Sequence, residues 1–236
     1  MDGVTVYDDP EQLAEAAAEL ILVQLRARRG KILLARGGAA RRAYQLVAQR
    51  ATPADYKGAH LFFADERMVP ATHAESNYGM VKRAWLEPAR FPPERVHRIR
   101  GEIEAERAAR LAEEDLRGVA GEPPQLDIAL LALGGDGHVA SLYPASDELE
   151  DTDRLYVPAR NDTRVTATLN LLASCKLVVF LAAGADRAES LRSALCDPPG
   201  AVPASLVSSA ARPPLWLVDR AAAALLPPDA RGPERS

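Results

Sequence analysis

The sequence predicts an α/β fold, with a mostly parallel, twisted sheet covered by helices on both faces. Several short runs are almost wholly apolar, including Lys31–Ala35, Leu126–Leu133 and Lys176–Gly184. Such runs are typical of strands that are buried on both faces. Segments with helical periodicity separate them, as expected where crossover helices connect parallel strands.

The first half of the chain carries clear boundary signals for these elements. The first expected helix follows Asp9, which is a good N-cap. Pro10 suits its first turn, and Gly30 can end it. Ser76 can cap a helix that continues to about Leu86. The other elements expected in this half are helices at 40–50 and 102–118, a strand at 60–64 and a weak strand at 96–99.

The second half continues the alternation of strands and helices. We expect a helix to begin near His138, directly after the apolar strand that ends at Leu133. Thr163–Leu169 alternates polar with apolar residues, as an edge or half-exposed strand does. The remaining expected elements are a helix ending at 195, a strand at 215–219 and a helix at 220–226.

Composition limits the domain organisation and the partners. A chain of 236 residues is long enough for one large domain, which we place at 1–226, with a flexible C-terminal tail at 227–236. The net charge of −4 argues against nucleic acid and anionic membranes as partners. Cys175 and Cys196 form neither a disulfide framework nor a zinc motif. We expect a cytoplasmic protein, because the acidic start does not resemble a signal peptide and no apolar run is long enough to span a membrane. We also expect it to be a monomer or a small homo-oligomer.

Polar clusters follow three of the expected strands. They are Gly37-Gly38, Asp65-Glu66-Arg67 and the run Gly134–His138. In an open parallel sheet, ligands bind beyond the carboxyl ends of the strands. A single polar turn is weak evidence, because turns favour Gly and Asp in any case. Three such clusters are consistent with one shared binding crevice.

The Gly-Asp-Gly-His turn offers acid–base chemistry. At a helix start, His138 could act as a neutral base, and Asp136 could orient it or share its proton. Taken alone, the turn is better explained structurally, with Asp136 as a helix-capping turn residue and His138 as a satisfied surface histidine. A metal site would need a third ligand at suitable spacing, and the sequence offers none, so no metal is expected. Arg67 suits an anion, either a phosphate or a developing oxyanion.

Longer stretches around these clusters resemble one enzyme family. "FFADERMVPATHAESNY" resembles the aspartate-glutamate-arginine block of the 6-phosphogluconolactonases, and "LALGGDGHVASLYP" is similar to their glycine-aspartate-glycine-histidine signature. The resemblance continues in "VPARNDTRVTATLNLLASCKLVVFLAAGADRAESL", "PASLV" and "LWLVDRAAA", and spans about residues 4 to 226. This group also includes the glucosamine-6-phosphate deaminases and shares a Rossmann-like fold.

The resemblance implies hydrolysis of 6-phospho-D-glucono-1,5-lactone to 6-phospho-D-gluconate, in the oxidative pentose phosphate pathway, without a cofactor. Its small-molecule partner would be a sugar phosphate lactone. His138 would be the general base that activates water, and Arg67 would stabilise developing negative charge. Asp65 and Asp136 would complete the polar frame. The residues implied for binding substrate or phosphate are Gly37, Gly38, Gly135, Gly137, Arg164 and Arg187.

The chain departs from the family pattern in its first glycine loop. That loop commonly carries hydroxyl side chains and a proline, whereas here it reads Arg36-Gly37-Gly38-Ala39-Ala40-Arg41-Arg42. Arg36, Arg41 or Arg42 could replace the missing hydroxyl donors, or all three could be exposed helix residues. Position 187 is Arg where the family usually has lysine, which keeps the charge and changes its geometry.

Two other functions remain open. An amino-sugar-phosphate deaminase or isomerase would use a glutamate after its Asp-Gly-His turn, and this chain has Ser141-Leu142-Tyr143-Pro144 there. A sugar-phosphate sensor that binds without turnover is the other alternative, by analogy of fold alone. An intact Asp136 and His138 favour chemistry over sensing.

Overall fold

The computed structural model describes residues 3–27, 30–151, 153–208, 213–232 and 234–235. Within these residues, eight strands form one parallel sheet in the order β11-β1-β10-β9-β6-β2-β3-β5. This confirms the predicted parallel, Rossmann-like arrangement. The strands are β1 (Val4–Tyr7), β2 (Gly30–Leu34), β3 (Ala59–Phe63), β5 (Val96–His97), β6 (Ile128–Ala132), β9 (Val178–Ala182), β10 (Leu215–Asp219) and β11 (Glu234–Arg235).

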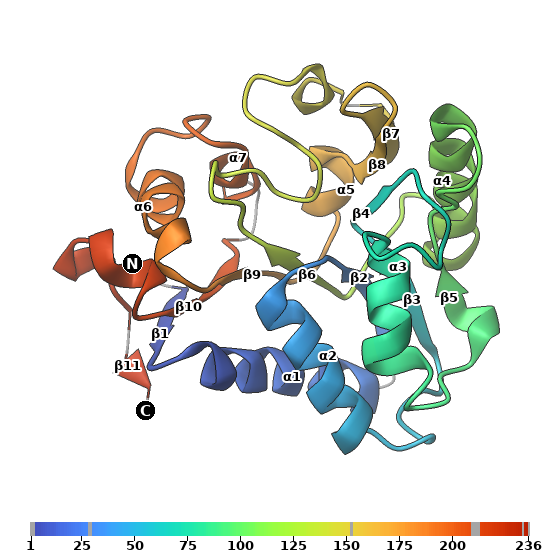
Figure 1. Ribbon diagram of the computed structural model, residues 1–236, viewed down its shortest axis with the longest axis horizontal. Coiled ribbons are helices and arrows are strands. Elements are labelled where there is room, and N and C mark those ends of the chain that lie inside the picture. The colour runs from blue at the N-terminus through green and yellow to red at the C-terminus, as the bar shows by residue number, and fades with distance from the viewer. Residues whose placement is uncertain (1–2, 28–29, 152, 209–212, 233, 236) are drawn as a thin grey trace.

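Helices cover both faces of this sheet, as predicted. In Figure 1, α1 and α2 lie below the strands, and α5, α6 and α7 lie above them. The α-helices are α1 (Pro10–Arg26), α2 (Gly38–Arg50), α3 (Asn77–Val81), α4 (Ala105–Ala120), α5 (Leu169–Ala173), α6 (Ala188–Cys196) and α7 (Pro203–Ser208). A π-helical turn, Lys82–Leu86, continues α3, and 3₁₀ turns occur at Pro93–Arg95, Asp147–Leu149, Ala185–Arg187, Ala222–Leu225 and Pro228–Ala230.

A smaller antiparallel sheet lies beside the large one. It has the order β4-β8-β7, with β4 at Asp65–Arg67, β7 at Tyr156–Ala159 and β8 at Arg164–Ala167. Only Ala64 separates β3 from β4, so the chain passes directly from the large sheet into the small one. The polar triplet after β3 is therefore held by strand pairing, which fixes its side chains more firmly than a loop would.

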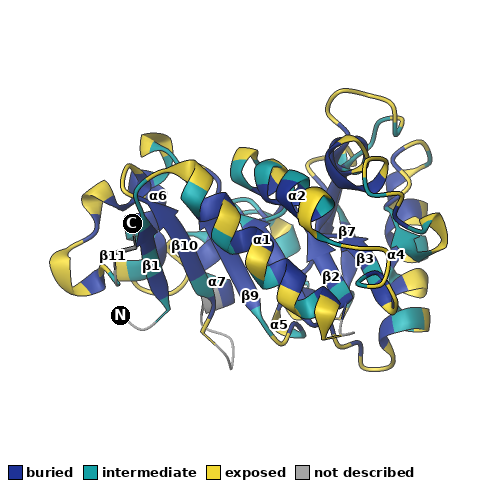
Figure 2. Cartoon of the chain, turned by 90° about the horizontal axis from the view of Figure 1, so that it is seen from below, coloured by how far each residue is buried: buried dark blue, intermediate teal, exposed yellow. Residues whose placement is uncertain are grey.

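The hydrophobic core fills the space between the sheet and its helices. Figure 2 shows the strands of the large sheet in the colour of buried residues, with exposed residues on the outer faces of the helices. β9 is buried at all five positions, and the rings of Phe180 and Trp216 stack across β9 and β10 with centroids 4.1 Å apart. Burial on both faces explains why these strands appear in the sequence as unbroken apolar runs.

Several predicted elements differ in the structure. No helix begins near His138, because residues 133–146 form a series of turns in which Ala140 and Ala145 adopt positive φ. Gly30 does not end α1, which stops at Arg26; it is the first residue of β2. The alternating segment at 163–169 is neither an edge nor half-exposed, since β8 is the middle strand of the small sheet and its residues 165–167 are buried.

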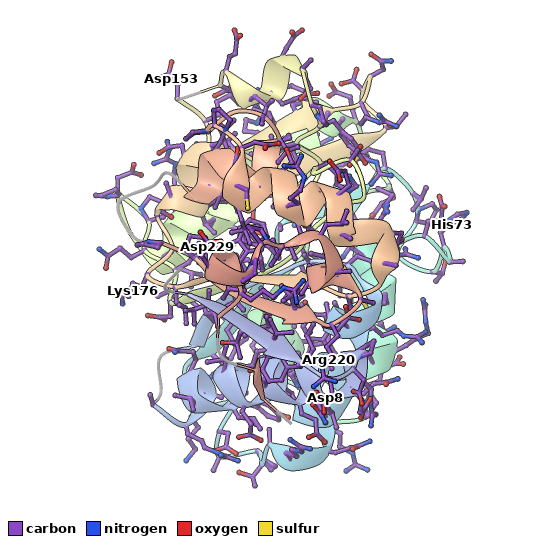
Figure 3. The ribbon with its side chains drawn as sticks, turned by 90° about the vertical axis from the view of Figure 1, so that its left-hand side faces the viewer. Asp8, His73, Asp153, Lys176, Arg220 and Asp229 are labelled. Carbon is purple, nitrogen blue, oxygen red and sulfur yellow. The ribbon has the colours of Figure 1, made fainter. Side chains whose placement is uncertain are left out.

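The ends of the described chain lie together at one side of the sheet. β11 pairs with β1, and Arg220 forms an ion pair of 2.8 Å with Asp8 (Figure 3). Residues 228–230 form a 3₁₀ turn, and the division into a domain at 1–226 and a tail stays a prediction. Among the described residues, no helix has both the length and the hydropathy that a bilayer crossing requires.

Candidate active site

A polar cavity lies beyond the carboxyl ends of β2, β3 and β6. From β2 the chain proceeds outward to β3 and β5, then returns to place β6 on the other side of β2. Such a reversal of strand order leaves a crevice between neighbouring strands. The cavity has a volume of about 270 Å³. Its lining residues are Ala35, Arg36, Gly37, Asp65, Arg67, Ala132, Leu133, Gly134, His138, Ala140, Arg164 and Arg187.

His138 and Asp136 form a hydrogen-bonded pair at this cavity. His138 Nδ1 lies 2.5 Å from Asp136 Oδ1, and the backbone N–H of His138 donates to the same oxygen at 3.1 Å. Desolvation raises the pKa of the Asp136 carboxyl, but the hydrogen bonds from the backbone and ring of His138 outweigh it and leave the pKa lowered. An ionised Asp136 can only accept, so Nδ1 carries a proton and donates it to this oxygen, and the neutral form of the ring has its lone pair on Nε2.

The position of the imidazole is set by its surroundings. A Cβ atom on Gly134 would overlap the His138 ring, so glycine is required at this position. The His138 ring also stacks on Tyr143, with centroids 4.6 Å apart. The guanidinium of Arg160 lies 4.2 Å from the centroid of Tyr143, which completes a stack of three groups. These contacts, and not a helix dipole, orient His138.

Asp65 is the buried carboxylate of the site. Its side chain accepts a hydrogen bond from Asn77 Nδ2 at 2.7 Å and one from Ser141 Oγ at 2.8 Å. Arg164 NH1 lies 3.7 Å from Asp65 Oδ2. Only 4% of Asp65 is exposed, so this carboxylate organises the cavity wall while Arg164 remains the more accessible partner.

Arg67 and Arg164 lie directly opposite each other on β4 and β8. Like charges on opposed residues repel, so the pair needs compensating acceptors or an anion. Asn77 Oδ1 accepts from Arg67 NH1, and Asp65 compensates Arg164. The Nε atom of Arg67 is buried and has no hydrogen-bond partner among the described residues. The two guanidinium groups therefore give one wall of the cavity a positive charge.

Glu66 fixes the segment that carries Asn77. Its carboxylate accepts from the backbone N–H groups of Asn77 at 2.7 Å and Tyr78 at 2.8 Å, and from Ser76 Oγ at 3.0 Å. Burial raises the pKa of Glu66, and these hydrogen bonds oppose that rise. Ser76 is also the predicted N-cap of α3, where its hydroxyl accepts from Gly79 N–H at 2.9 Å.

The start of α2 forms a second polar region next to the cavity. Gly37 is its N-cap and offers no side-chain acceptor to the first N–H groups of the helix. An adjoining cavity of about 340 Å³ contacts Gly37, Gly38 and Arg187. Because unpaired N–H groups at a helix start attract anions, this region suits a phosphate with Arg187 as its counter-charge.

The structure gathers most of the predicted site residues. Gly37, Asp65, Arg67, His138, Arg164 and Arg187 line the first cavity. Gly38 lines the adjoining one, and Asp136 contacts His138. Gly135 and Gly137 do not line either cavity; Gly137 adopts φ +81° against Val202 and shapes the turn.

Among the arginines of the glycine loop, only Arg36 lines the first cavity, where NH1 donates to Glu75 O at 2.6 Å. Arg42 pairs with Glu11 at 2.6 Å on the outer face of α1 and α2, and Arg41 is exposed.

Three contributors were not assigned a role from the sequence. Asn77 joins Asp65 to Arg67, Ser141 donates to Asp65, and Tyr143 stacks on His138. Asn77 is buried and polar, and it follows Asp65 by twelve residues across an irregular loop, a separation that no spacing rule connects. Ser141 is fully buried in this contact, so it is a poor candidate for a nucleophile.

The chain is similar to known proteins along most of its length. The family model for glucosamine-6-phosphate isomerases/6-phosphogluconolactonase matches residues 8–216. A 6-phosphogluconolactonase from Rattus norvegicus is 31% identical over 239 residues, which covers 94% of this chain and 93% of that protein. A 6-phosphogluconolactonase from Synechocystis is 33% identical over 209 residues, which covers 84% of this chain and 85% of that protein.

A solved structure has the same fold. The 6-phosphogluconolactonase from Trypanosoma cruzi superimposes with a TM-score of 0.85 at 25% identity, covering 96% of this chain and 97% of its own. The matched family residues 8–216 include every residue described above as lining the cavity. The chain therefore belongs to the glucosamine-6-phosphate isomerase/6-phosphogluconolactonase family.

Proposed function

We propose that this protein is a 6-phosphogluconolactonase, which hydrolyses 6-phospho-D-glucono-1,5-lactone to 6-phospho-D-gluconate in the oxidative pentose phosphate pathway. One observation carries the proposal: the His138–Asp136 pair opens onto the same cavity as Arg67, Arg164 and Arg187. A base and a set of cations in one cavity suit the hydrolysis of an ester that carries a phosphate.

His138 acts as the general base in this proposal. With Nδ1–H directed to Asp136, Nε2 takes a proton from water as the water oxygen attacks C1 of the lactone. The bond between C1 and the ring oxygen then breaks, and the imidazolium returns the proton to that oxygen. The balanced result is one water consumed and one free hydroxyl and carboxylic acid formed, without a covalent intermediate on the protein.

Arg67 stabilises the negative charge that develops on the carbonyl oxygen. Its guanidinium is held by Asn77 and keeps a buried Nε–H without a partner among the described residues. A preorganised cation in a confined site lowers the energy of the charged intermediate without having to reorganise. Asp65 holds this arrangement together through Asn77 and Arg164.

The phosphate on C6 binds away from the reacting carbon. We assign it to the start of α2, with Gly37 and Gly38 N–H groups, and to Arg187, which lines both cavities. Arg36 and Arg164 add positive charge on the side of the first cavity. Binding energy from this remote group positions the carbonyl for attack.

A deaminase would need a glutamate after its Asp-Gly-His turn, and this chain has no carboxylate there. The position after the Asp-Gly-His turn where a deaminase would use glutamate lies in Ser141–Pro144, and Ser141 is buried against Asp65. The acid–base pair His138–Asp136 also argues against a sensor that only binds, because binding a sugar phosphate does not need a poised base.

The test is a coupled assay on freshly generated lactone. Glucose 6-phosphate, its dehydrogenase and NADP produce the lactone, and added 6-phosphogluconate dehydrogenase reports each opened ring as a second NADPH. We expect the protein to accelerate ring opening above the spontaneous rate, and Arg187→Ala to raise KM more than it lowers kcat. Absence of acceleration, or release of ammonia from glucosamine 6-phosphate, would contradict the proposal.

A further inference from the structure

A separate cavity of about 390 Å³ lies between the helical segment that begins with α3 and the edge strand β5. It is bordered by α3, by the π-helical turn Lys82–Leu86 and by the segment that leads into β5. Its volume falls within the range of about 300–1,000 Å³ that is usual for small-molecule sites. It shares no lining residue with the active-site cavity.

Positive charge predominates in its lining. Lys82, Arg90 and Arg98 line the cavity together with one carboxylate, Glu87. Lys82 Nζ lies 3.3 Å from Glu87 Oε1, but both side chains are exposed, and such pairs contribute little to stability. Among the described residues, no carboxylate lies within ion-pair distance of Arg90. An anion could therefore bind Lys82 and Arg90 at little cost in broken contacts.

Two aromatic rings accompany these cations. Tyr78 lines the cavity with the Arg98 guanidinium 5.5 Å from its ring centroid, and Glu102 holds Arg98 there by a hydrogen bond of 2.8 Å. Phe91 also lines the cavity and packs edge-on against Trp85, with centroids 5.8 Å apart. Aromatic faces and guanidinium planes stack on planar rings, whereas Lys82 and Arg90 suit a phosphate. The combined chemistry is that of an aromatic phosphate.

The backbone around the cavity is unusual in two places. The turn Lys82–Leu86 is π-helical, a form that often occurs at functional sites. Arg90 adopts φ +50°, a left-handed conformation that disfavours side chains other than glycine. Backbone conformations of this kind tend to collect at ligand sites. Both features place the side chains of Lys82 and Arg90 at the cavity.

The cavity is connected to the active site through adjacent residues of α3. Tyr78 lines this cavity, and its N–H donates to Glu66 Oε2 at 2.8 Å. The preceding residue, Asn77, donates to the other Glu66 oxygen at 2.7 Å and holds both Asp65 and Arg67. A ligand that moves Tyr78 must therefore act on the segment that positions Arg67.

We propose that this cavity is an effector site for a mononucleotide, whose ring stacks at Tyr78 and Arg98 and whose phosphate binds Lys82 and Arg90. Its occupancy changes the rate of the active site through Tyr78 and Asn77. Binding of the nucleotide is independent of the reaction, and only the change in rate rests on the proposed lactonase function.

The first experiment measures binding of AMP to the full-length protein by calorimetry. We expect wild type to bind AMP, and the double variant Lys82→Ala/Arg90→Ala to raise Kd at least about ten-fold, which corresponds to about 1.4 kcal/mol. Arg107→Ala, an exposed arginine on α4, is the matched control and should leave Kd unchanged. Adenosine and inorganic phosphate should each bind more weakly than AMP, since each lacks half of the ligand.

Tryptophan fluorescence distinguishes binding of AMP at this cavity from binding at the active-site cavity. In a Trp216→Phe background, Trp85 is the remaining tryptophan, and its contact with Phe91 should make its emission change when AMP binds. No binding of AMP by wild type, or binding that survives Lys82→Ala/Arg90→Ala, would overturn the proposal. Loss of AMP binding in Arg187→Ala with retention in the double variant would place AMP in the active-site cavity and would also overturn it.

The second experiment adds AMP to the coupled lactone assay. We expect AMP to change kcat or KM of wild type and to have no effect on the double variant. Binding of AMP at Lys82 and Arg90 without any change in rate would refute the effector role. A protein that binds AMP there but opens no lactone would refute the proposed function and leave the binding site intact.

Discussion

Replacing Asn77 should lower both the stability of the fold and the rate of the reaction, because this one side chain connects Asp65 to Arg67. Its Nδ2 donates to Asp65 Oδ1 at 2.7 Å and to Asp65 O at 2.8 Å, and its Oδ1 accepts from Arg67. Only 1% of the side chain and backbone of Asn77 is exposed, so water cannot replace these contacts. Asn77→Ala leaves a buried carboxylate and a guanidinium each without one partner.

The magnitude follows from the kind of hydrogen bond that is lost. A bond to a charged group contributes about 1.5–3 kcal/mol, and Asn77 makes two of these and one neutral bond. Contributions within one network do not add fully, so we expect Asn77→Ala to lower the free energy of unfolding by about 3–4 kcal/mol. A displaced Arg67 should also lower kcat about 100-fold, the effect typical of small misplacement of a catalytic group.

Denaturant unfolding and the coupled lactone assay measure these two effects. Asn77→Asp keeps an acceptor for Arg67 but replaces both donors to Asp65 with a second carboxylate, so repulsion between the two carboxylates adds to the lost hydrogen bonds. Gln49→Ala removes an exposed amide from α2 and serves as the control. Asn77 does not support Asp65 and Arg67 in this way if Asn77→Ala changes the free energy of unfolding by less than about 0.5 kcal/mol, the usual limit for surface substitutions, and leaves kcat unchanged.

Substitutions at three further positions test other contacts. Gly134→Ala should lower kcat strongly in the lactone assay with little change in KM, because its Cβ would displace the His138 ring; wild-type kcat would contradict this. Tyr143→Leu should lower kcat more than Tyr143→Phe does, since phenylalanine preserves a stack worth about 0.5–1.5 kcal/mol, and equal rates would exclude a role for stacking. The hydrogen bond from Arg98 lowers the pKa of Glu102 from 4.5 to about 2, so this pair stabilises the fold above pH 4.5 and its contribution is lost as pH falls toward 2. Because the side chain is 39% exposed the loss should stay below about 1 kcal/mol, and denaturant unfolding of Glu102→Gln should show a shallower acid decline than wild type.

The long, buried elements could be predicted from the sequence. The apolar strands β2, β3, β6, β9 and β10 were identified from continuous hydrophobic runs, and α1 from its Asp9-Pro10 start. Short elements were missed, among them β1, β7, α5 and α7, because four to six residues carry too little periodicity. Their formation depends on pairing with distant segments, such as β1 with β10, which local pattern does not reveal.

The site residues that directly follow strands could be predicted from the sequence. Asp65, Arg67 and His138 follow β3 and β6, so the rule for parallel sheets brought them together. The surroundings of His138 were not predictable, because a row of turns replaces the expected helix and only the folded chain brings Tyr143 onto the ring. The link from Asp65 through Asn77 to Arg67 likewise arises from tertiary structure.

In the proposed reaction, His138 is the base that activates water for lactone hydrolysis. The most direct test is kcat of His138→Ala on freshly generated 6-phosphogluconolactone, measured beside wild type and corrected for spontaneous opening. Since a positioned general base contributes about 10²–10⁴-fold, we expect kcat to fall at least about 100-fold in a variant that still folds. Turnover by His138→Ala at the wild-type rate would show that His138 is not the base.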